Sequence, residues 1–398
     1  MLGPRPRAAI ARLAEAMLSV RPLVEGIAAP VRVAPVTAPE SLHPGQQRAL
    51  RALLARVGQR IGVTGLSLAG GAKFDDLQMF ERVVTDRLEL ARLVADGGVL
   101  PVDQLGEVDR IVSDTVAGSF DGFIRRETIH SSDGVPLSTY SAGAGDQTVV
   151  LVPACGMPAL LAESWVRHFA GNHRVLTWES RGLFGALAHG DGYSERLDAQ
   201  AADLCTVMDR HGVADAHVIG LCGGAAIALA AAAEWPSRIR SLSLWHGAYG
   251  FAEDYPKTAH QQGLIELMTA AARSRTAAAA VDAAFCRAML TSTPADVAHL
   301  ILYPYASPEL LYRYCRLNLG ITSADVEPYL SRVPGPTLVV TSRDDDIADP
   351  RGSHRVAAGL PRGQLRVEPH GDHISLFASN ASLLRLAEDF MVRGAQPS

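Results

Sequence analysis

Lysine is nearly absent from this chain of 398 residues, and long apolar runs are lacking as well. Lys73 and Lys257 are the only lysines, so arginine supplies the other side-chain cations, and the formal net charge is −5. This balance gives no reason to expect nucleic acid as a partner. No apolar run reaches the roughly eighteen residues that a membrane-spanning helix needs, so no membrane association is expected.

Cysteine is also scarce, and its spacing does not suit a metal site. The five cysteines are odd in number and lack C-x-x-C pairs: Cys155, Cys205, Cys222, Cys286 and Cys315. Residues 1–30 lack a secretory signal, because Glu15 and Arg21 interrupt any apolar core. We therefore expect reduced thiols, a cytoplasmic location, and neither a bound metal nor a cofactor.

Residues 1–118 have the apolar spacing of helices rather than strands. Apolar side chains recur at intervals of three and four in four segments: 6–20, 46–61, 75–94 and 102–116. We interpret this region as a packing or dimerisation element, which would make the protein a homodimer. A lid over the substrate is the alternative interpretation.

The pattern changes to alternating strands and helices over residues 119–398. A hairpin is expected over 123–130 and 137–141, and buried strands over 148–152, 174–178, 239–245, 337–341 and 365–367. Helices between the strands predict an α/β fold with a doubly wound, mostly parallel sheet. The helical insertion at about 250–332 lies between two strands and is expected to form a cap.

Residues 217–226 are the most informative stretch of the sequence. Val218 and Ile219 predict a short buried strand, Gly220 and Gly224 flank Cys222, and an alanine-rich helix follows. Strand, G-x-C-x-G and helix are the layout of a nucleophile elbow, in which a strained turn exposes the central side chain. The alternative interpretation is a tight turn with Cys222 as a small buried side chain.

A nucleophile at this position needs a base and an acid from later loops. His370 and His373 follow the strand that ends near Val367, and Asp344 and Asp345 follow the strand over 337–341. The resulting chain order of nucleophile, acid and histidine is that of α/β-hydrolases.

The chain from about residue 120 to 391 resembles the α/β-hydrolase superfamily. Five segments in the family's order carry the resemblance: 151–156, 178–182, 220–224, the Asp345 loop and 371–373. The resemblance implies a G-x-x-D acid loop, in which Ser342 here replaces the glycine, so Asp345 is favoured over Asp344. It likewise favours His373 over His370. It also implies an oxyanion hole formed by the N–H groups of Gly223 and Cys155, although Pro153 and Ala154 replace the usual His-Gly of that loop.

Several other polar residues have structural interpretations. Glu179 and Arg181 are expected to brace their loop, and His246 either lines the pocket or is a satisfied loop histidine. The remaining histidines that we considered are interpreted as solvated: His173, His211, His217 and His354.

A cysteine in the elbow predicts acyl chemistry, because a thiol near a histidine and a helix N-terminus ionises readily. We expect an acyl-transfer enzyme with Cys222, His373 and Asp345 as its triad, similar to thioesterases and acyltransferases of secondary metabolism. Its substrate would be a small acyl group linked to a carrier protein or coenzyme. Alternatives are a lyase that eliminates a small acid, a polymerase like the polyhydroxyalkanoate synthases, and a non-catalytic binding relative.

Overall fold

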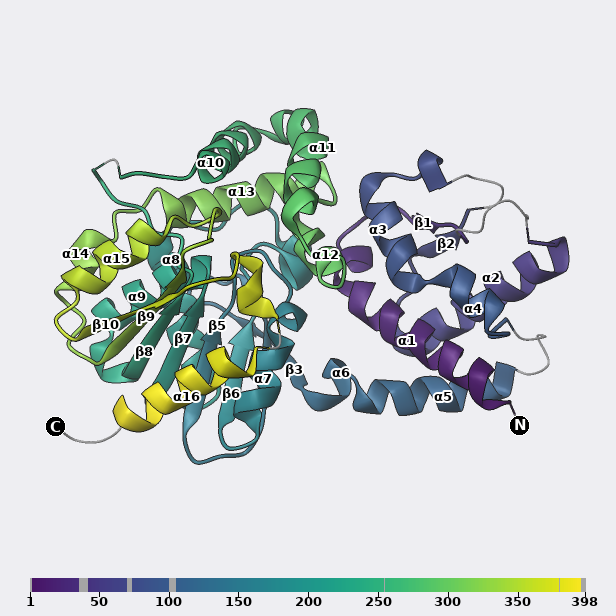
Figure 1. The fold of residues 1–398 in the computed structure, drawn as a ribbon, viewed down its shortest axis with the longest axis horizontal. Helices are drawn as coiled ribbons and strands as arrows, with labels where there is room; N and C mark the ends of the chain where they lie inside the picture. Colours follow the sequence, from purple (N-terminus) through teal and green to yellow (C-terminus); the bar gives the residue numbers. More distant parts are fainter. Residues whose placement is uncertain are drawn as a thin grey trace. The chain divides into compact units, whose positions relative to one another are not determined.

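The computed structural model describes residues 2–35, 42–69, 74–99, 105–253, 255–378 and 380–394 (Figure 1). The chain divides into two compact units. The helical unit comprises Met1–Ile124 and Cys286–Ser307, and the sheet unit comprises Arg125–Phe285 and Pro308–Ser398. None of the described helices combines the length and apolar character needed to cross a bilayer.

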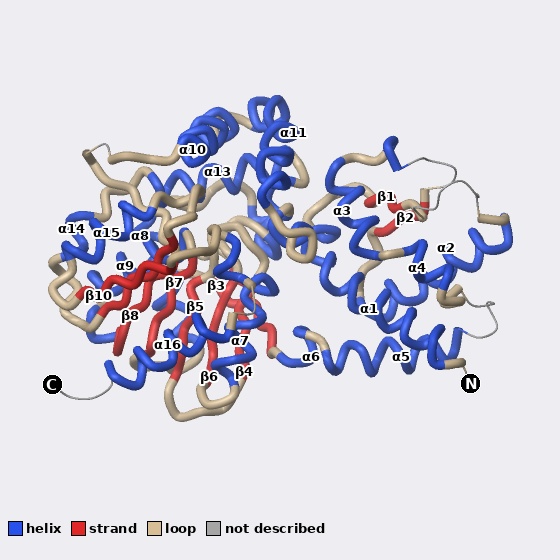
Figure 2. The backbone as a smooth tube through the Cα atoms, in the orientation of Figure 1, coloured by secondary structure: helices blue, strands red, loops and turns tan. Residues whose placement is uncertain are grey.

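An eight-stranded sheet organises the sheet unit, in the order β10-β9-β8-β7-β5-β6-β4-β3 (Figure 2). The pairings of β4 with β3 and with β6 are antiparallel, and the other pairings of this sheet are parallel. The strands are β3 (Arg125–His130), β4 (Pro136–Ala142), β5 (Thr148–Val152), β6 (Arg174–Trp178), β7 (Ala216–Leu221), β8 (Ile239–Trp245), β9 (Thr337–Ser342) and β10 (Gly363–Glu368). The prediction of a mostly parallel α/β sheet is confirmed.

Helices cover both faces of this sheet, which is why its central strands are buried along their whole length. Every residue of β5 and β7 is buried. One face carries α8 (Leu197–Arg210), α9 (Gly223–Glu234) and α15 (Pro350–Gly359); the other carries α7 (Glu163–Ala170) and α16 (Ala381–Gly394) (Figure 1). Short 3₁₀ helices complete the connections: Ala159–Ala162, Phe184–His189, Pro236–Arg238 and Ile374–Phe377.

The segment between β8 and β9 is helical, as the sequence predicts. It contains α10 (Ala259–Ala271), α11 (Arg275–Ser292), α12 (Ala298–Ile301), the 3₁₀ turn Tyr303–Tyr305, α13 (Pro308–Thr322) and α14 (Glu327–Leu330). Residues 286–307 of this segment belong to the helical unit, where α12 packs against α1 and α3. In the sheet unit, α13 packs against α9 and α10.

The helical unit is built on α1 (Pro4–Glu25), whose residues Ile10, Leu13, Met17 and Val20 are buried at the helical period. Its other elements are β1 (Val31–Val33), α2 (Pro44–Ile61), β2 (Leu66–Leu68), the 3₁₀ turn Phe74–Asp76, α3 (Met79–Leu88), α4 (Leu90–Ala95), α5 (Leu105–Gly118) and α6 (Phe120–Phe123). Helices α2 and α5 pack against α1 and against each other.

The structure differs from the expected helices of this unit in two respects. The helix expected over 75–94 is broken between α3 and α4, because Glu89 has a left-handed backbone with φ of 46°. Residues 31–33 and 66–68 form a short parallel strand pair that the helical pattern did not predict. Residues 102–104 of the last expected helix lie outside the described residues.

Candidate active site

Cys222 lies in a strained turn between β7 and α9. Its φ is 55° and its ψ is −123°, a conformation that residues with a side chain rarely adopt. Small neighbours make the turn possible: a Cβ on Gly224 would lie 2.4 Å from the carbonyl oxygen of Val152, and one on Gly220 would lie 2.6 Å from the carbonyl oxygen of Gly224. The backbone N–H of Cys222 donates to the carbonyl oxygen of Trp245 at 2.9 Å. The strand, turn and helix therefore have the geometry of a nucleophile elbow.

Asp345 and His373 come together in the buried interior. The Nδ1–H of His373 donates to Asp345 Oδ2 at 2.9 Å, and both residues are at most 3% exposed. The other oxygen, Oδ1, accepts the backbone N–H groups of Ile347 at 3.1 Å and Ala348 at 2.8 Å. These donors hold the carboxylate in one orientation towards the imidazole.

The alternative pair, Asp344 and His370, lies on the surface. Their nearest charged atoms are 3.6 Å apart, and the side chain of His370 is 90% exposed. A pair in contact with water has little electrostatic influence on the Cys222 thiol, because solvent screens its charges. The structure therefore brings His373 and Asp345 to the elbow and leaves His370 and Asp344 outside it.

The charges of this cluster reinforce one another. Burial acts to lower the pKa of His373, but Asp345 and Cys222 outweigh it and raise that pKa well above its usual value. Burial would raise the pKa of Asp345, but His373 and His246 hold it well below its usual range. The Nε2 atom of His373 is buried and has no hydrogen-bond partner among the described residues, although Cys222 is near enough to influence its pKa. That nitrogen is free to exchange a proton with the thiol or a substrate.

The backbone N–H groups expected to form the oxyanion hole, those of Gly223 and Cys155, lie close to each other. A Cβ built on Gly223 would lie 3.7 Å from the backbone nitrogen of Cys155, so the loop after β5 meets the first turn of α9. Neither N–H donates to another residue in the described part of the chain. The Cys155 thiol is itself buried, and burial together with nearby Cys222 raises its pKa to about 12. Cys155 thus offers its backbone rather than a reactive sulfur.

Comparison with known proteins identifies the fold. No protein-family model matches the chain. The α/β hydrolase MGS-M2, from a Medee basin deep-sea metagenome library, superposes with a TM-score of 0.55 at 18% identity, over 68% of this chain and 98% of its own. The chain has the α/β-hydrolase fold.

Sequence relatives include both hydrolases and a transferase. The RutD protein of Variovorax paradoxus, whose name assigns it carbamate hydrolysis, is 26% identical over 56% of this chain and 84% of its own. The L-allo-isoleucyltransferase of Pseudomonas savastanoi pv. glycinea is 24% identical over 45% of this chain and 63% of its own. The chain is therefore similar to hydrolases and to an acyltransferase.

The sequence left open whether His246 lines the pocket or is a satisfied loop histidine, and the structure places it against Asp345. Its Nδ1 lies 3.1 Å from Asp345 Oδ2, and its ring stands edge-on to His373 with centroids 5.9 Å apart. Positive φ at a non-glycine residue, here 46°, is a signal that only the structure reveals. Interpreting His217 as solvated was wrong: it lies within β7, buried, with Nδ1 2.7 Å from Ser241 Oγ.

His246, Asp345 and His373 also have the residue types of a metal site, with their ligand atoms within 4.8 Å of one another. Both Nδ1 atoms face the same carboxylate oxygen at hydrogen-bonding distances of 2.9 and 3.1 Å. A metal ion would need to replace the protons between them, because Zn²⁺ binds nitrogen and oxygen at about 2 Å. The distances between His246, Asp345 and His373 are therefore those of hydrogen bonds rather than of ligands around a metal ion.

The loop after β6 supports the loop that carries Cys155. Ser180 Oγ accepts the backbone N–H of Gly156 at 2.8 Å. Arg181 is 1% exposed and forms paired hydrogen bonds with Asp203, at 2.8 and 2.6 Å, and with Asp133, at 2.7 and 3.1 Å. The interpretation of Arg181 as a brace for this loop is confirmed.

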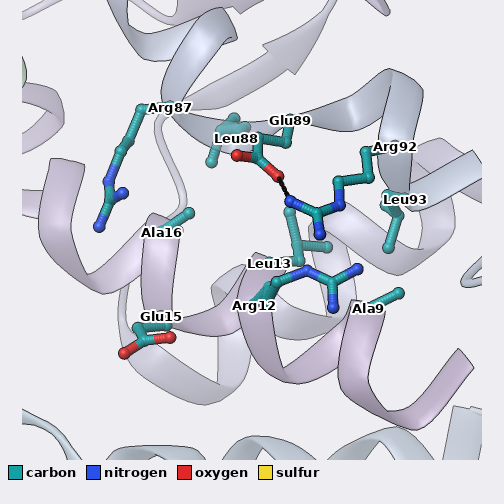
Figure 3. Close-up of a pocket in the computed structure, with 10 residues that line it drawn as sticks. All are labelled: Ala9, Arg12, Leu13, Glu15, Ala16, Arg87, Leu88, Glu89, Arg92 and Leu93. Atoms are coloured by element: carbon teal, nitrogen blue, oxygen red, sulfur yellow. Dashed lines mark hydrogen bonds and ion pairs between the residues drawn. The ribbon is translucent and has the colours of Figure 1, made fainter. Parts of the chain in front are cut away.

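A separate pocket in the helical unit lacks a comparable set of reactive groups. Residues of α1, α3 and α4 line an open pocket of about 130 Å³ (Figure 3). Three arginines line it, but Arg12 is paired with Asp96, Arg92 with Glu89, and Arg87 donates to Ser19 Oγ at 3.0 Å. Its lining contains no cysteine, serine or histidine, so it offers neither a thiol or hydroxyl nor an imidazole.

Proposed function

We propose that this protein is an acyl-transfer enzyme in which Cys222 is the nucleophile, His373 its base and Asp345 the acid that orients the base. The observation that carries the proposal is Cys222 at φ 55°, in an elbow beside a histidine whose pKa it raises. A binding protein would have no need to combine a strained cysteine with a buried imidazole and carboxylate.

In the first step His373 Nε2 takes the thiol proton, and Cys222 sulfur attacks the carbonyl carbon of a thioester or ester. Asp345 stabilises the resulting imidazolium through Nδ1, and the N–H groups of Gly223 and Cys155 receive the oxyanion. When the tetrahedral intermediate collapses, the bond to the leaving group breaks and His373 returns the proton to that group. The acyl group then remains on Cys222 as a thioester.

In the second step His373 takes a proton from an acceptor, which attacks the acyl-enzyme and releases the Cys222 thiol. Side chains of helix α13 help to decide whether the acceptor is water or a bound molecule. Ile321 Cδ1 would lie 3.7 Å from a Cβ on Gly223, and Tyr314 Cδ2 would lie 2.4 Å from one on Gly156. An apolar side chain beside Gly223 and an aromatic one beside Gly156, the residue after Cys155, limit access of water, which favours transfer to a bound acceptor.

The similarity to an L-allo-isoleucyltransferase supports the same choice. A cysteine thioester is close in energy to a thioester donor, so an acyl group can move reversibly from donor thiol to enzyme to acceptor thiol. We therefore propose a small acyl group linked to a carrier protein or coenzyme as the substrate, and a role in secondary metabolism.

Intact-protein mass spectrometry after mixing with a panel of acyl and aminoacyl thioesters tests this function. Wild-type protein should gain one acyl mass that Cys222→Ala does not gain, and His373→Ala should acylate about 10²–10⁴-fold more slowly. Cys205→Ala is the matched control, because Cys205 lies buried in α8 and should leave acylation unchanged.

Decay of the adduct distinguishes the outcomes. Faster decay with an added thiol or amine than in buffer supports a transferase, and equal decay indicates a hydrolase. Product formation that survives Cys222→Ala but not His373→Ala would contradict a nucleophilic cysteine and point to elimination.

A further inference from the structure

A second histidine shares the acid of the proposed triad. His246 follows the last residue of β8, is 1% exposed, and has a left-handed backbone with φ of 46°. Its N–H donates to the carbonyl oxygen of Val340 in β9 at 2.8 Å, which fixes the strained backbone. Strain of this kind persists only where the surroundings hold it, and it is common at functional sites.

The carboxylate of Asp345 is fully occupied by donors. Oδ1 accepts two backbone N–H groups, and Oδ2 accepts both His373 Nδ1, at 2.9 Å, and His246 Nδ1, at 3.1 Å. An ionised carboxylate can only accept hydrogen bonds, so each imidazole must carry a proton on Nδ1. The two rings therefore compete for one oxygen.

We propose that His246 is a positioning residue, whose Nδ1–H holds Asp345 Oδ2 in place and limits how strongly that oxygen binds His373. This inference rests on the proposed function, because it assigns His246 a role in setting the basicity of His373 during acyl transfer. It adds a fourth side chain to the three of the triad and gives the turn after β8 a part in the chemistry.

The physical reason is the division of one negative charge between two donors. A second donor on Oδ2 weakens the attraction of that oxygen for the His373 imidazolium. Without His246, Asp345 would bind His373 alone, and the imidazolium would give up its proton less readily. Other ionisable groups near this pair are Cys222, beyond His373, and Asp349, which is itself bonded to Arg351.

Nuclear magnetic resonance of histidine-¹⁵N-labelled, full-length wild-type protein tests the hydrogen bond between His246 and Asp345 directly. The His246 ring should be protonated on Nδ1, with a downfield proton that exchanges slowly, and His246→Asn assigns the signal by removing it. A His246 ring protonated only on Nε2 would overturn the proposal, since Nδ1 could then not donate.

Two substitutions test the consequence. Asparagine places an amide N–H where His246 Nδ1 lies and tolerates positive φ, whereas leucine keeps much of the volume and cannot donate. His246→Leu should lower the rate of Cys222 acylation by about 10–100-fold and move the alkaline limb of its pH profile up by about one unit. His246→Asn should stay within about threefold of wild type and keep the wild-type profile.

The outcomes separate this inference from the proposed function. If wild-type protein forms no acyl adduct on Cys222, the proposed function fails, while the tautomer measurement still decides whether His246 holds Asp345. If adducts form and His246→Leu keeps the wild-type rate and pH profile, His246 has no positioning role. Equal losses in the leucine and asparagine variants, with an unshifted profile, would also overturn the proposal. If His246→Leu does not fold, His246→Ser provides the comparison, because its shorter side chain cannot reach Oδ2.

Discussion

The backbone N–H of Cys222 donates to the carbonyl oxygen of Trp245, 2.9 Å away, and Trp245 directly precedes His246. One strand end therefore holds both the turn of the proposed nucleophile and the second donor to Asp345. Because β8 pairs with β7 on one side and β9 on the other, the nucleophile and the acid are positioned by neighbouring strands of one sheet. A displacement of the end of β8 would therefore move the Cys222 turn and His246 together.

The elbow should tolerate no side chain at Gly224. A Cβ there would lie 2.4 Å from Val152 O and 2.5 Å from Pro153 O, both backbone atoms. We expect Gly224→Ala to lower the free energy of unfolding in urea by about 1–3 kcal/mol, because strand and helix must separate. Gly263→Ala is the control: nothing lies within 4 Å of its Cβ position in α10, so about 1 kcal/mol of stabilisation is expected there. An unchanged midpoint for Gly224→Ala would contradict the close approach.

Removal of the buried Arg181 should be costly. Arg181→Met leaves Asp203, at 2% exposure, without its paired donor, and unfolding free energy should fall by about 3–5 kcal/mol. The double variant Arg181→Met/Asp203→Leu should recover much of this loss. Arg196→Met removes an exposed partner of Asp198 instead, and should change stability by less than about 1 kcal/mol. Similar losses for the buried and exposed arginines would refute the argument from burial.

Ser180 should affect catalysis more than stability. Its hydroxyl accepts the N–H of Gly156, which follows the proposed oxyanion donor Cys155. We expect Ser180→Ala to slow single-turnover acylation about tenfold with KM nearly unchanged, because the loop is held less firmly. Ser382→Ala, which loses only an exposed hydrogen bond to Asn380, should acylate at the wild-type rate. A larger change in KM than in rate would assign Ser180 to substrate binding.

His299 should make the helical unit sensitive to acid. It lies in α12, 3% exposed, with neither ring nitrogen bonded among the described residues, and burial together with Arg87 lowers its pKa to about 3. The unfolded chain takes up this proton near pH 6.5. The contribution of the neutral His299 ring to the free energy of unfolding is therefore fully present above pH 6.5. It is lost as the pH falls from 6.5 towards the pKa of His299 in the folded protein.

We expect His299→Leu to be more stable than wild type at pH 7. Between pH 6.5 and 4.5, its free energy of unfolding should fall by about 2 kcal/mol less than that of wild type. Urea titrations at both pH values measure this difference. His354→Gln, on the exposed side of α15, is the control and should follow wild type. Equal acid sensitivity of His299→Leu and wild type would rule out a neutral buried ring.

Much of the sheet unit was predictable because its signals are local. Apolar runs such as 148–152 match strands buried on both faces, and glycines around Cys222 mark a turn that few other residues permit. Chain order then indicated which later loops reach the same edge of a parallel sheet. That order could not separate Asp345 from Asp344, whereas burial distinguishes them at once.

The remaining features depend on contacts that are distant in sequence. His246 and Asp345 are 99 positions apart, and a histidine carries no sequence mark of positive φ. His217 is buried because β7 lies inside the sheet between β5 and β8, and its register places it opposite Ser241; an isolated pattern reveals neither. Residues 286–307 belong to the helical unit through packing with α1 and α3, although the chain reaches them from within the insertion.

The burial of the cysteines makes the folded protein selective towards thiol reagents. Cys155, Cys205, Cys286 and Cys315 are buried, and Cys222 alone is partly accessible. An alkylating fluorophore or an isotope-labelled methylthio group should therefore attach only to Cys222 in the native protein. The elbow thus serves as a built-in labelling position, at which the arrival of a donor or acceptor can be followed without removing any other cysteine.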